Sequence, residues 1–313
     1  MEKIIRAFLP GADVASLAPL GEGIINTTFS VSDADGKRYV IQKVNTNVFP
    51  DPYSVMENTA NVTDWMRKRL AEEGKCFDRC VPLFLQTEEG DYLYRTPEGG
   101  FWRCSRLIEG ATAHVHVTDP ALLYNAGKGY GEFVRLTDGF PAGTLTEVLP
   151  DFHNTKKRFQ AFLEAVERDA AGRAREVDRE IHYLKEREEL AGSIVAMLES
   201  GELPLRVTHN DTKLNNVLLD EKTHEALCVI DLDTVMPGYA LCDFGDSVRF
   251  GANTSAEDET DLSLVSIDLE LFECYTMGYL KGCGSMLSQG EIELLPYAPI
   301  LITLELAMRF LTD

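Results

Sequence analysis

The stretch at residues 205–233 constrains this chain most, because it sets a short group of polar side chains beside two apolar runs. It spells LRVTHNDTKLNNVLLDEKTHEALCVIDLD. The apolar runs, 214–219 and 226–232, are typical of two strands joined by a polar turn. Asp231 ends the second run. Four polar side chains occupy a segment that we expect to be short and irregular: His209, Asp211, Lys213 and Asn216. This spacing predicts a catalytic loop followed by a metal-binding strand end.

The chemistry of phosphoryl transfer explains the spacing. That reaction needs an acceptor hydroxyl held in line and the phosphate charge neutralised. Asp211 can accept the proton of the acceptor, and Lys213 can place a cation on the γ-phosphate. Asn216 and Asp231 can offer the hard oxygen ligands that suit Mg²⁺. The alternative is a turn whose Asn and Asp side chains bond their own backbone. Four such residues before an apolar run that ends in Asp favour the catalytic interpretation.

The motifs resemble those of a known family. VTHNDTKLNNVLLD and CVIDLDTVMPG are similar to the aminoglycoside phosphotransferase and choline kinase group of the protein-kinase-like superfamily. The run IDLDTVMPGYALCDFGDSVRFGANTSAEDE most resembles N-acetylhexosamine 1-kinases, which phosphorylate the anomeric hydroxyl of N-acetylglucosamine or N-acetylgalactosamine. The resemblance spans nearly the whole chain. It implies an α+β, two-lobed kinase-like fold that uses ATP and Mg²⁺. The small N-lobe, residues 1–108, would hold an antiparallel sheet, and the C-lobe, residues 109–313, would be mainly helical.

Two glycines lie between the first two expected strands. Gly21 and Gly23 permit the backbone to approach a phosphate closely, although a plain hairpin turn is the alternative. No G-x-x-x-x-G-K-[ST] motif occurs, which excludes a P-loop nucleotidase. Three further strands are expected at 81–85, 92–95 and 101–107. By resemblance, the break after them is a hinge where backbone groups of Arg106 and Ile108 bind adenine.

A lysine and a glutamate of the N-lobe are expected to form an ion pair. By resemblance, Lys43 at the end of a strand binds the α- and β-phosphates and pairs with a helix glutamate. Asp51 and Pro52 predict the start of a helix, and Glu57 lies in its first turns beside a buried stripe. The alternative for Glu57 is compensation of the helix dipole. We favour the ion pair.

Further candidates lie in the second half of the chain. By resemblance, Asp243 braces the backbone of the catalytic loop, although Asp243-Phe244-Gly245 spells the kinase metal motif. Asp233 is a candidate second carboxylate for metal or phosphate. Arg249 either pairs with Asp246 or contacts substrate, and we favour the pair. Arg309, inside an apolar helix, is a candidate sugar contact, with a structural ion pair as the alternative.

Helical periodicity dominates beyond the hinge. Helices are expected at 122–136, around 159–166, at 262–279 and at 296–311. The third would place Leu264 and Ile267 inward. Family members continue past the last helix, so the resemblance implies a native chain longer than these 313 residues.

Composition limits the partners. A net charge of −21 disfavours nucleic acid. Seven cysteines, several in apolar runs, indicate reduced thiols and a cytoplasmic protein. No signal peptide or run of transmembrane length is expected, and no obligate protein partner is evident.

The expected partner is therefore a small-molecule sugar. Three alternatives stay open. In the first, the acceptor is an aminoglycoside, choline or homoserine. In the second, the protein is a nucleotide-binding scaffold without activity. The third, a protein kinase, is less favoured because no A-P-E motif follows Asp231.

Overall fold

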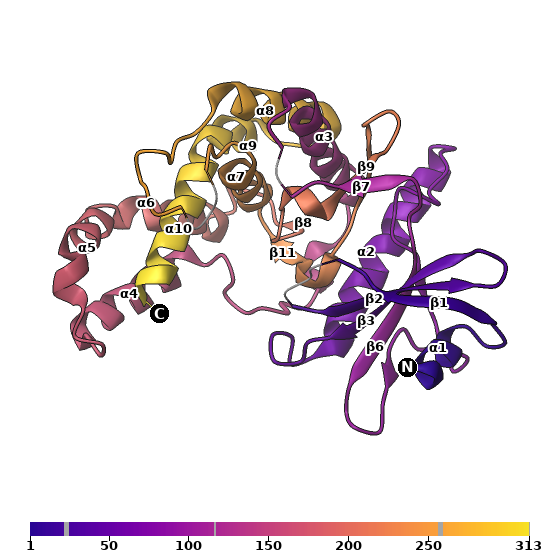
Figure 1. The fold of residues 1–313 in the computed structure, drawn as a ribbon. Coiled ribbons are helices and arrows are strands. Elements are labelled where there is room, and N and C mark those ends of the chain that lie inside the picture. Colours follow the sequence, from indigo (N-terminus) through magenta and orange to yellow (C-terminus); the bar gives the residue numbers. More distant parts are fainter. Residues whose placement is uncertain (22–24, 116, 256–258, 313) are drawn as a thin grey trace. The chain divides into compact units, whose positions relative to one another are not determined.

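A computed structural model of the chain describes residues 1–21, 25–115, 117–255 and 259–312 (Figure 1). The chain divides into two compact units. Unit 1 contains Met1–Ala113 and Val217–Val235, and unit 2 contains His114–Asn216 and Met236–Asp313. Unit 1 thus continues to Ala113, past the expected division at residue 108, and it also includes a later segment. The segment Val217–Val235, which carries Asp231, belongs with the N-terminal unit, because its strand β9 pairs with β7 of that unit.

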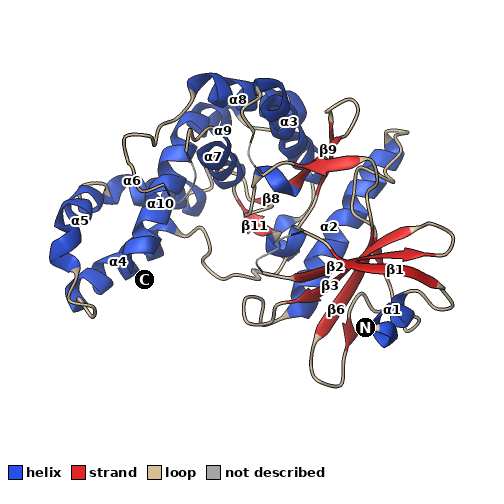
Figure 2. Cartoon of the chain, viewed as in Figure 1, coloured by secondary structure: helices blue, strands red, loops and turns tan. Residues whose placement is uncertain are grey.

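Unit 1 is built on an antiparallel sheet of order β1-β2-β3-β6-β4, in which β5 also pairs with β6 (red in Figure 2). A second sheet has the order β10-β9-β7. The elements of this unit are α1 (Glu2–Phe8), β1 (Val14–Pro19), β2 (Thr27–Asp33), β3 (Arg38–Val44), α2 (Pro52–Glu72), β4 (Phe84–Leu85), β5 (Tyr94–Arg95), β6 (Phe101–Arg106), β7 (Ala111–Ala113), β9 (Val217–Asp220), β10 (Ala226–Val229) and the 3₁₀ turn η4 (Leu232–Thr234).

Helix α2 begins where the sequence predicts. The side chain of Asp51 accepts hydrogen bonds from the backbone N–H groups of Tyr53 and Ser54, at 3.1 and 3.3 Å, and Pro52 occupies the first helical position. This arrangement satisfies two N–H groups that a helix start leaves without partners. The helix then buries the predicted apolar stripe: Val55, Thr59, Val62, Met66 and Leu70.

Unit 2 is mainly helical (blue in Figure 2). Strands β8 and β11 form a short antiparallel pair. β8 leads into the catalytic loop, and β11 leads into helix α7. The elements are α3 (Pro120–Thr137), η1 (Ala142–Thr144), α4 (Thr155–Arg168), η2 (Ala174–Val177), α5 (Asp178–Lys185), α6 (Glu188–Glu199), β8 (Arg206–Thr208), η3 (Leu214–Asn216), β11 (Met236–Gly238), α7 (Ala240–Gly251), α8 (Leu269–Cys283), α9 (Gln289–Leu294), η5 (Leu295–Tyr297) and α10 (Ala298–Thr312).

Helices α3 and α8 pack side by side and approach each other closely (Figure 1). Four glycines make this possible. A Cβ atom added at Gly278 would overlap the carbonyl oxygen of Tyr124 and lie 2.8 Å from its carbonyl carbon. A Cβ at Gly131 would lie 2.8 Å from the backbone nitrogen of Cys283. Gly127 and Gly282 are restricted in the same way. The helix pair thus forms a rigid support in unit 2.

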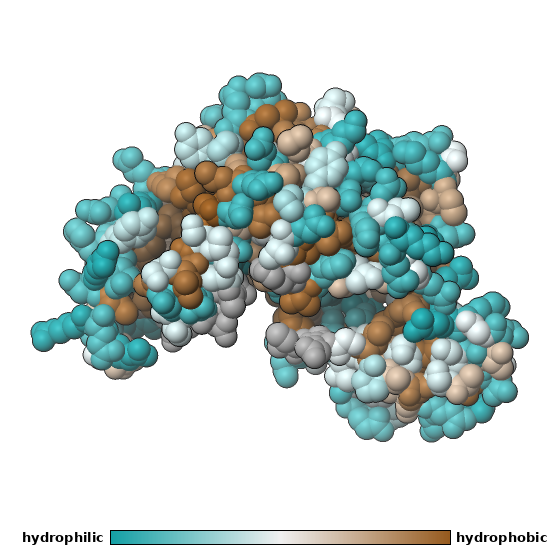
Figure 3. All heavy atoms as spheres, turned by 45° about the horizontal axis from the view of Figure 1, so that its top comes forward, coloured by the Kyte–Doolittle hydropathy of each residue, from teal (hydrophilic) through white to brown (hydrophobic). Residues whose placement is uncertain are grey.

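The prediction of a helix from residue 262 is wrong at its start. Helix α8 begins at Leu269, where Asp268 caps it by accepting from the N–H groups of Glu270 and Leu271. The preceding segment is not helical, and Leu264 and Ile267 are exposed instead of buried. Figure 3 shows hydrophobic side chains (brown) among hydrophilic ones (teal) on the face that it draws.

In the described part of the chain, one run is long and apolar enough, by length and composition alone, to cross a membrane: Gln289–Thr312. The sequence predicted no run of transmembrane length. Gln289–Thr312 contains α9, η5 and α10. Helix α10 packs against α4 and α7, as the core helix of a soluble protein does, and such a helix passes the same test.

All seven cysteines are free thiols, as expected. Four are buried in the two units: Cys104, Cys228, Cys242 and Cys283.

Candidate active site

The backbone of the catalytic loop in unit 2 is held by Asp243 on α7. Its carboxylate accepts the N–H groups of His209 and Asn210, at 2.7 and 2.8 Å. Asp243 is 3% exposed. Burial raises the pKa of this carboxyl group, against the opposing effects of His209 and of the two N–H groups. The bracing role expected for Asp243 is confirmed.

Two hydroxyl groups hold the same loop through its carbonyls. Ser247 on α7 donates to the carbonyl oxygen of Thr212 at 2.9 Å, and Tyr130 on α3 donates to that of Lys213 at 2.8 Å. The loop is therefore fixed through both its N–H and its C=O groups. Sequence reasoning missed Ser247 and Tyr130, because each lies on a buried helix face where an apolar residue would give the same periodicity.

His209 lies inside unit 2, with none of its surface exposed. The rings of Tyr130 and Phe133 meet it edge-on, with centroid distances of 5.7 and 6.0 Å. Its Nδ1 accepts the backbone N–H of Asp211 at 3.2 Å. These contacts let His209 orient the loop, whereas direct contact of its ring with a substrate would need exposed surface. We therefore assign His209, which the sequence predicted as a catalytic residue, a role in positioning the loop.

Three of the predicted residues lie together: Asp211, Lys213 and Asn216. The Nζ atom of Lys213 lies 2.9 Å from one carboxylate oxygen of Asp211. The amide nitrogen of Asn216 donates to the other carboxylate oxygen at 3.2 Å and to the backbone carbonyl of Asp211 at 2.9 Å. The amide nitrogen of Asn216 is thus engaged, and its amide oxygen has no hydrogen bond among the described residues. This oxygen is the atom that a metal ion would need.

Asp231 follows β10 in unit 1 and stands at the N-cap position of the turn η4, without a capping hydrogen bond from its side chain. It is exposed, and its backbone is left-handed, with φ 60° and ψ 57°. A residue with a Cβ atom seldom adopts this conformation, and such positions gather at functional sites. Asn210 of the catalytic loop has φ 63°. Both predicted motifs therefore contain a backbone position of this kind.

The neighbouring Asp233 has a different environment. It is 3% exposed, and Arg103 and Asn26 bind its two carboxylate oxygens, Asn26 at 2.7 Å. Arg103 is also buried and donates to Gln42 at 3.0 Å. Because both oxygens are engaged in unit 1, we assign Asp233 a structural role in place of the metal or phosphate role expected for it.

The expected ion pair between Lys43 and Glu57 is not formed among the described residues. Both side chains are exposed, and Glu57 points away from the buried stripe of α2. Polar contacts of the neighbouring residues anchor α2 instead. The hydroxyl of Thr59 donates to the carbonyl of Leu232 at 3.2 Å, and Asn58 donates to that of Val235 at 2.9 Å. Roles for Lys43 and Glu57 in binding nucleotide stay predictions.

The remaining N-lobe candidates are only partly described. Gly21 has φ 72°, as the predicted turn requires. Gly23 lies outside the described residues. At the expected hinge, the N–H of Arg106 donates to the carbonyl of Leu83 at 2.9 Å. Ile108 follows the end of β6, and no backbone hydrogen bond engages it among the described residues. Its backbone groups suit the predicted contact with adenine.

The two arginine candidates differ. Arg249 pairs with Asp246, with Nη2 and Oδ1 3.0 Å apart, so the favoured local pair is confirmed. The guanidinium of Arg309 lies 5.8 Å from the ring centroid of Phe152. It forms no ion pair within the described ranges, so the structural alternative is not formed. It stays a candidate for the substrate.

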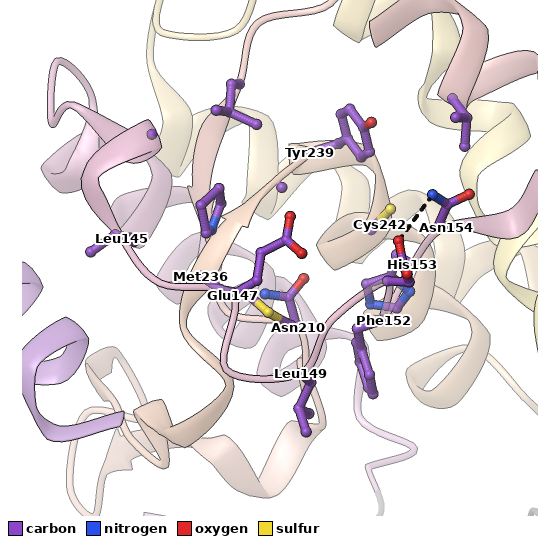
Figure 4. A pocket seen from close by; sticks show the side chains of 16 residues that line it. Leu145, Glu147, Leu149, Phe152, His153, Asn154, Asn210, Met236, Tyr239 and Cys242 are labelled. Atoms are coloured by element: carbon purple, nitrogen blue, oxygen red, sulfur yellow. Dashed lines mark hydrogen bonds between the residues drawn. The ribbon is translucent and has the colours of Figure 1, made fainter. Parts of the chain in front are cut away.

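A cavity of about 350 Å³ lies in unit 2 beside the catalytic loop (Figure 4). Asn210, the residue before Asp211, forms part of its wall. Glu147 and Tyr239 also line it. No lysine or arginine lines it among the described residues. The remaining wall combines apolar side chains with Asp151, His153 and Asn154. A cavity of this size and polarity suits a small hydroxylated molecule.

The two units together define the protein-kinase-like fold, with an antiparallel-sheet N-terminal region and a helical C-terminal region. The profile of the Phosphotransferase enzyme family matches residues 16–264. The chain therefore belongs to that family. It is a phosphotransferase acting on hydroxyl groups, of the aminoglycoside phosphotransferase and choline kinase type.

Solved structures with the same fold include three kinases of small molecules. The microcompartment-associated aminopropanol kinase is 17% identical with a TM-score of 0.59, over 100% of this chain and 90% of that one. Amicoumacin kinase hAmiN, crystallised with AMP-PNP and Ca²⁺, is 12% identical with a TM-score of 0.58, over 94% and 79%. The choline kinase of Cryptosporidium parvum Iowa II is 16% identical with a TM-score of 0.56, over 99% and 87%. Identities this low support the fold alone.

Proposed function

We propose that the protein transfers the γ-phosphoryl group of ATP to a sugar hydroxyl, namely the anomeric hydroxyl of an N-acetylhexosamine. One observation carries the proposal. Asp211 lies with Lys213 and Asn216 on a loop whose backbone is fixed by buried side chains, and the preceding residue, Asn210, lines a cavity of about 350 Å³. A preorganised carboxylate beside a polar cavity suits transfer to a small hydroxyl compound.

In the proposed reaction, Asp211 orients the acceptor hydroxyl and takes its proton. The acceptor oxygen forms a bond to the γ-phosphorus, the bond from that phosphorus to the bridging oxygen breaks, and ADP leaves. Lys213, 2.9 Å from Asp211, supplies positive charge near the transferred group. We propose Lys43, Gly21 and Ile108 as nucleotide contacts, with Lys43 on the phosphates.

Asn216 and Asp231 are the proposed ligands of Mg²⁺. Both offer the oxygen donors that this ion prefers. The chemistry of Asn216 fits this role, because its bonds to Asp211 use the amide nitrogen and leave the amide oxygen. When bound, the ion would neutralise charge on the phosphates. The presence of AMP-PNP and Ca²⁺ with amicoumacin kinase supports the use of a nucleotide and a divalent ion.

The choice of sugar depends on the resemblance of the IDLDTVMPG and DFGDSVRFGAN runs to N-acetylhexosamine 1-kinases. The cavity walls are compatible with it, since they combine polar groups with apolar side chains. Arg309, a candidate sugar contact from the sequence, lines a different cavity with Arg158, so we assign it no contact with an acceptor in this one.

A panel of acceptors with ATP consumption as the readout tests the proposal. The panel contains N-acetylglucosamine, N-acetylgalactosamine, an aminoglycoside, choline and homoserine. We expect turnover with an N-acetylhexosamine and a ³¹P signal of an anomeric phosphate ester. ATP consumption with another acceptor and with neither N-acetylhexosamine would contradict the sugar assignment. No ATP consumption with any acceptor would contradict the kinase activity.

A further inference from the structure

The cavity beside the catalytic loop contains two carboxylates with different surroundings. Asp151 is paired, because Lys157 lies 2.9 Å from it and Asn154 donates to it at 3.3 Å. The hydrogen bond from Lys157 holds the pKa of Asp151 below its usual range. Glu147 has no hydrogen bond and no ion pair among the residues that the structure describes. The cavity therefore presents one carboxylate whose oxygens are both available.

Tyr239 lies near Glu147 in the same cavity. Both side chains line the cavity, as does Asn210 (Figure 4). The phenol has no side-chain hydrogen bond within the described ranges. Burial raises the pKa of Tyr239, and Cys242, Glu199 and Glu147 add to the rise. Tyr239 therefore stays a neutral phenol that can both donate and accept a hydrogen bond.

The hydrogen-bonding capacity of these two groups and of the Asn210 amide indicates what the cavity can bind. The amide nitrogen of Asn210 already donates to the carbonyl of Thr208 at 3.2 Å, which turns its nitrogen away from a ligand. An ionised carboxylate is an acceptor only. The Glu147 carboxylate and the Tyr239 phenol together therefore offer more acceptors than donors, so they match a ligand rich in hydroxyl donors. No cationic lysine or arginine lines the described wall to bind an anionic acceptor.

We infer that Glu147 determines acceptor specificity, with its carboxylate accepting hydrogen bonds from hydroxyl groups of an uncharged, polyhydroxylated acceptor and Tyr239 contributing its phenol. This inference rests on the proposed function, since it assigns the cavity to the acceptor. In this inference Glu147 binds the acceptor and takes no part in the phosphoryl transfer step. Glu147 is exposed in the described structure, so discrimination arises because an acceptor that lacks the matching hydroxyls forgoes its hydrogen bonds to this charged group.

The test uses the full chain with Glu147→Gln, Tyr239→Phe and the matched control Glu167→Gln, an exposed glutamate on α4 that does not line the cavity. Binding of N-acetylglucosamine and of glucosamine is measured without ATP by ligand-observed NMR and titration calorimetry. We expect Glu147→Gln to weaken binding of both sugars by about tenfold to a hundredfold, as for a hydrogen bond to a charged group. Tyr239→Phe should weaken binding less, and Glu167→Gln should have no effect.

Kinetics separate the inference from the proposed function. Glu147→Gln should raise the KM for the acceptor, with kcat and the KM for ATP nearly unchanged. Equal binding of both sugars by wild type and Glu147→Gln, or no binding of either sugar to the wild type, would overturn the inference. Loss of binding for glucosamine alone would show recognition of a cation and would also overturn it. Sugar binding that depends on Glu147 without any ATP consumption would contradict only the proposed function.

Discussion

The glycine contact between α3 and α8 gives a sharp stability prediction. In a helix interior, Gly→Ala normally stabilises by about 1 kcal/mol. At Gly278 the new Cβ would overlap the carbonyl oxygen of Tyr124 and lie 2.8 Å from its carbon and 3.0 Å from the nitrogen of Lys128. Carbon atoms prefer separations of about 3.5–4.0 Å. All three neighbours are backbone atoms, so the helices must separate. Overpacking costs up to about 3 kcal/mol.

The net effect of Gly278→Ala is therefore a loss of about 2 kcal/mol. For a unit of this size, that lowers the melting temperature by about 4–8 °C. Gly192→Ala is the matched control, because Gly192 lies inside α6 with nothing within 4 Å of an added Cβ. It should raise the melting temperature by about 2–4 °C. Thermal unfolding followed by circular dichroism measures both. A Gly278→Ala protein that melts at or above the wild-type temperature would refute the reasoning.

Three further substitutions test the buried polar contacts. Arg103→Met leaves the Asp233 carboxylate buried without its cation and should destabilise by about 3–5 kcal/mol in urea unfolding, while adding Asp233→Leu should restore much of the loss. Tyr130→Phe removes the donor to the part-buried Lys213 carbonyl, which should cost about 0.5–1.5 kcal/mol and lower kcat more than it changes the KM for ATP; an unchanged kcat would argue against a positioning role. Asp243→Asn replaces one acceptor oxygen by a donor facing a backbone N–H, so stability should fall by about 1.5–3 kcal/mol and turnover should fall with it; a variant with wild-type stability would contradict the bracing role.

The sequence predicted elements whose signals are local. The start of α2 follows from Asp51 and Pro52, since an N-cap side chain and a proline at the first helical position act within one turn. The grouping of Asp211, Lys213 and Asn216 follows from their short spacing.

Contacts between residues far apart in the chain were not predictable in this way. Arg103 and Asp233 are 130 positions apart, and nothing local in the sequence indicates that they meet inside unit 1. The apolar residues before Leu269 continue the helical pattern of α8, yet the cap of Asp268 begins the helix later. The strand β7 is three residues long and forms because β9 offers an edge, which periodicity does not reveal.

The most direct test of the account is turnover by Asp211→Asn, because the substitution keeps the shape of the side chain and removes its capacity to accept the acceptor's proton. We expect ATP consumption with the preferred acceptor to fall by about 10²–10⁴-fold. Nucleotide affinity, measured by titration with an ATP analogue, should stay within a few-fold of wild type. A variant that retains turnover within about tenfold of the wild-type rate would contradict the assignment of Asp211 as the catalytic base.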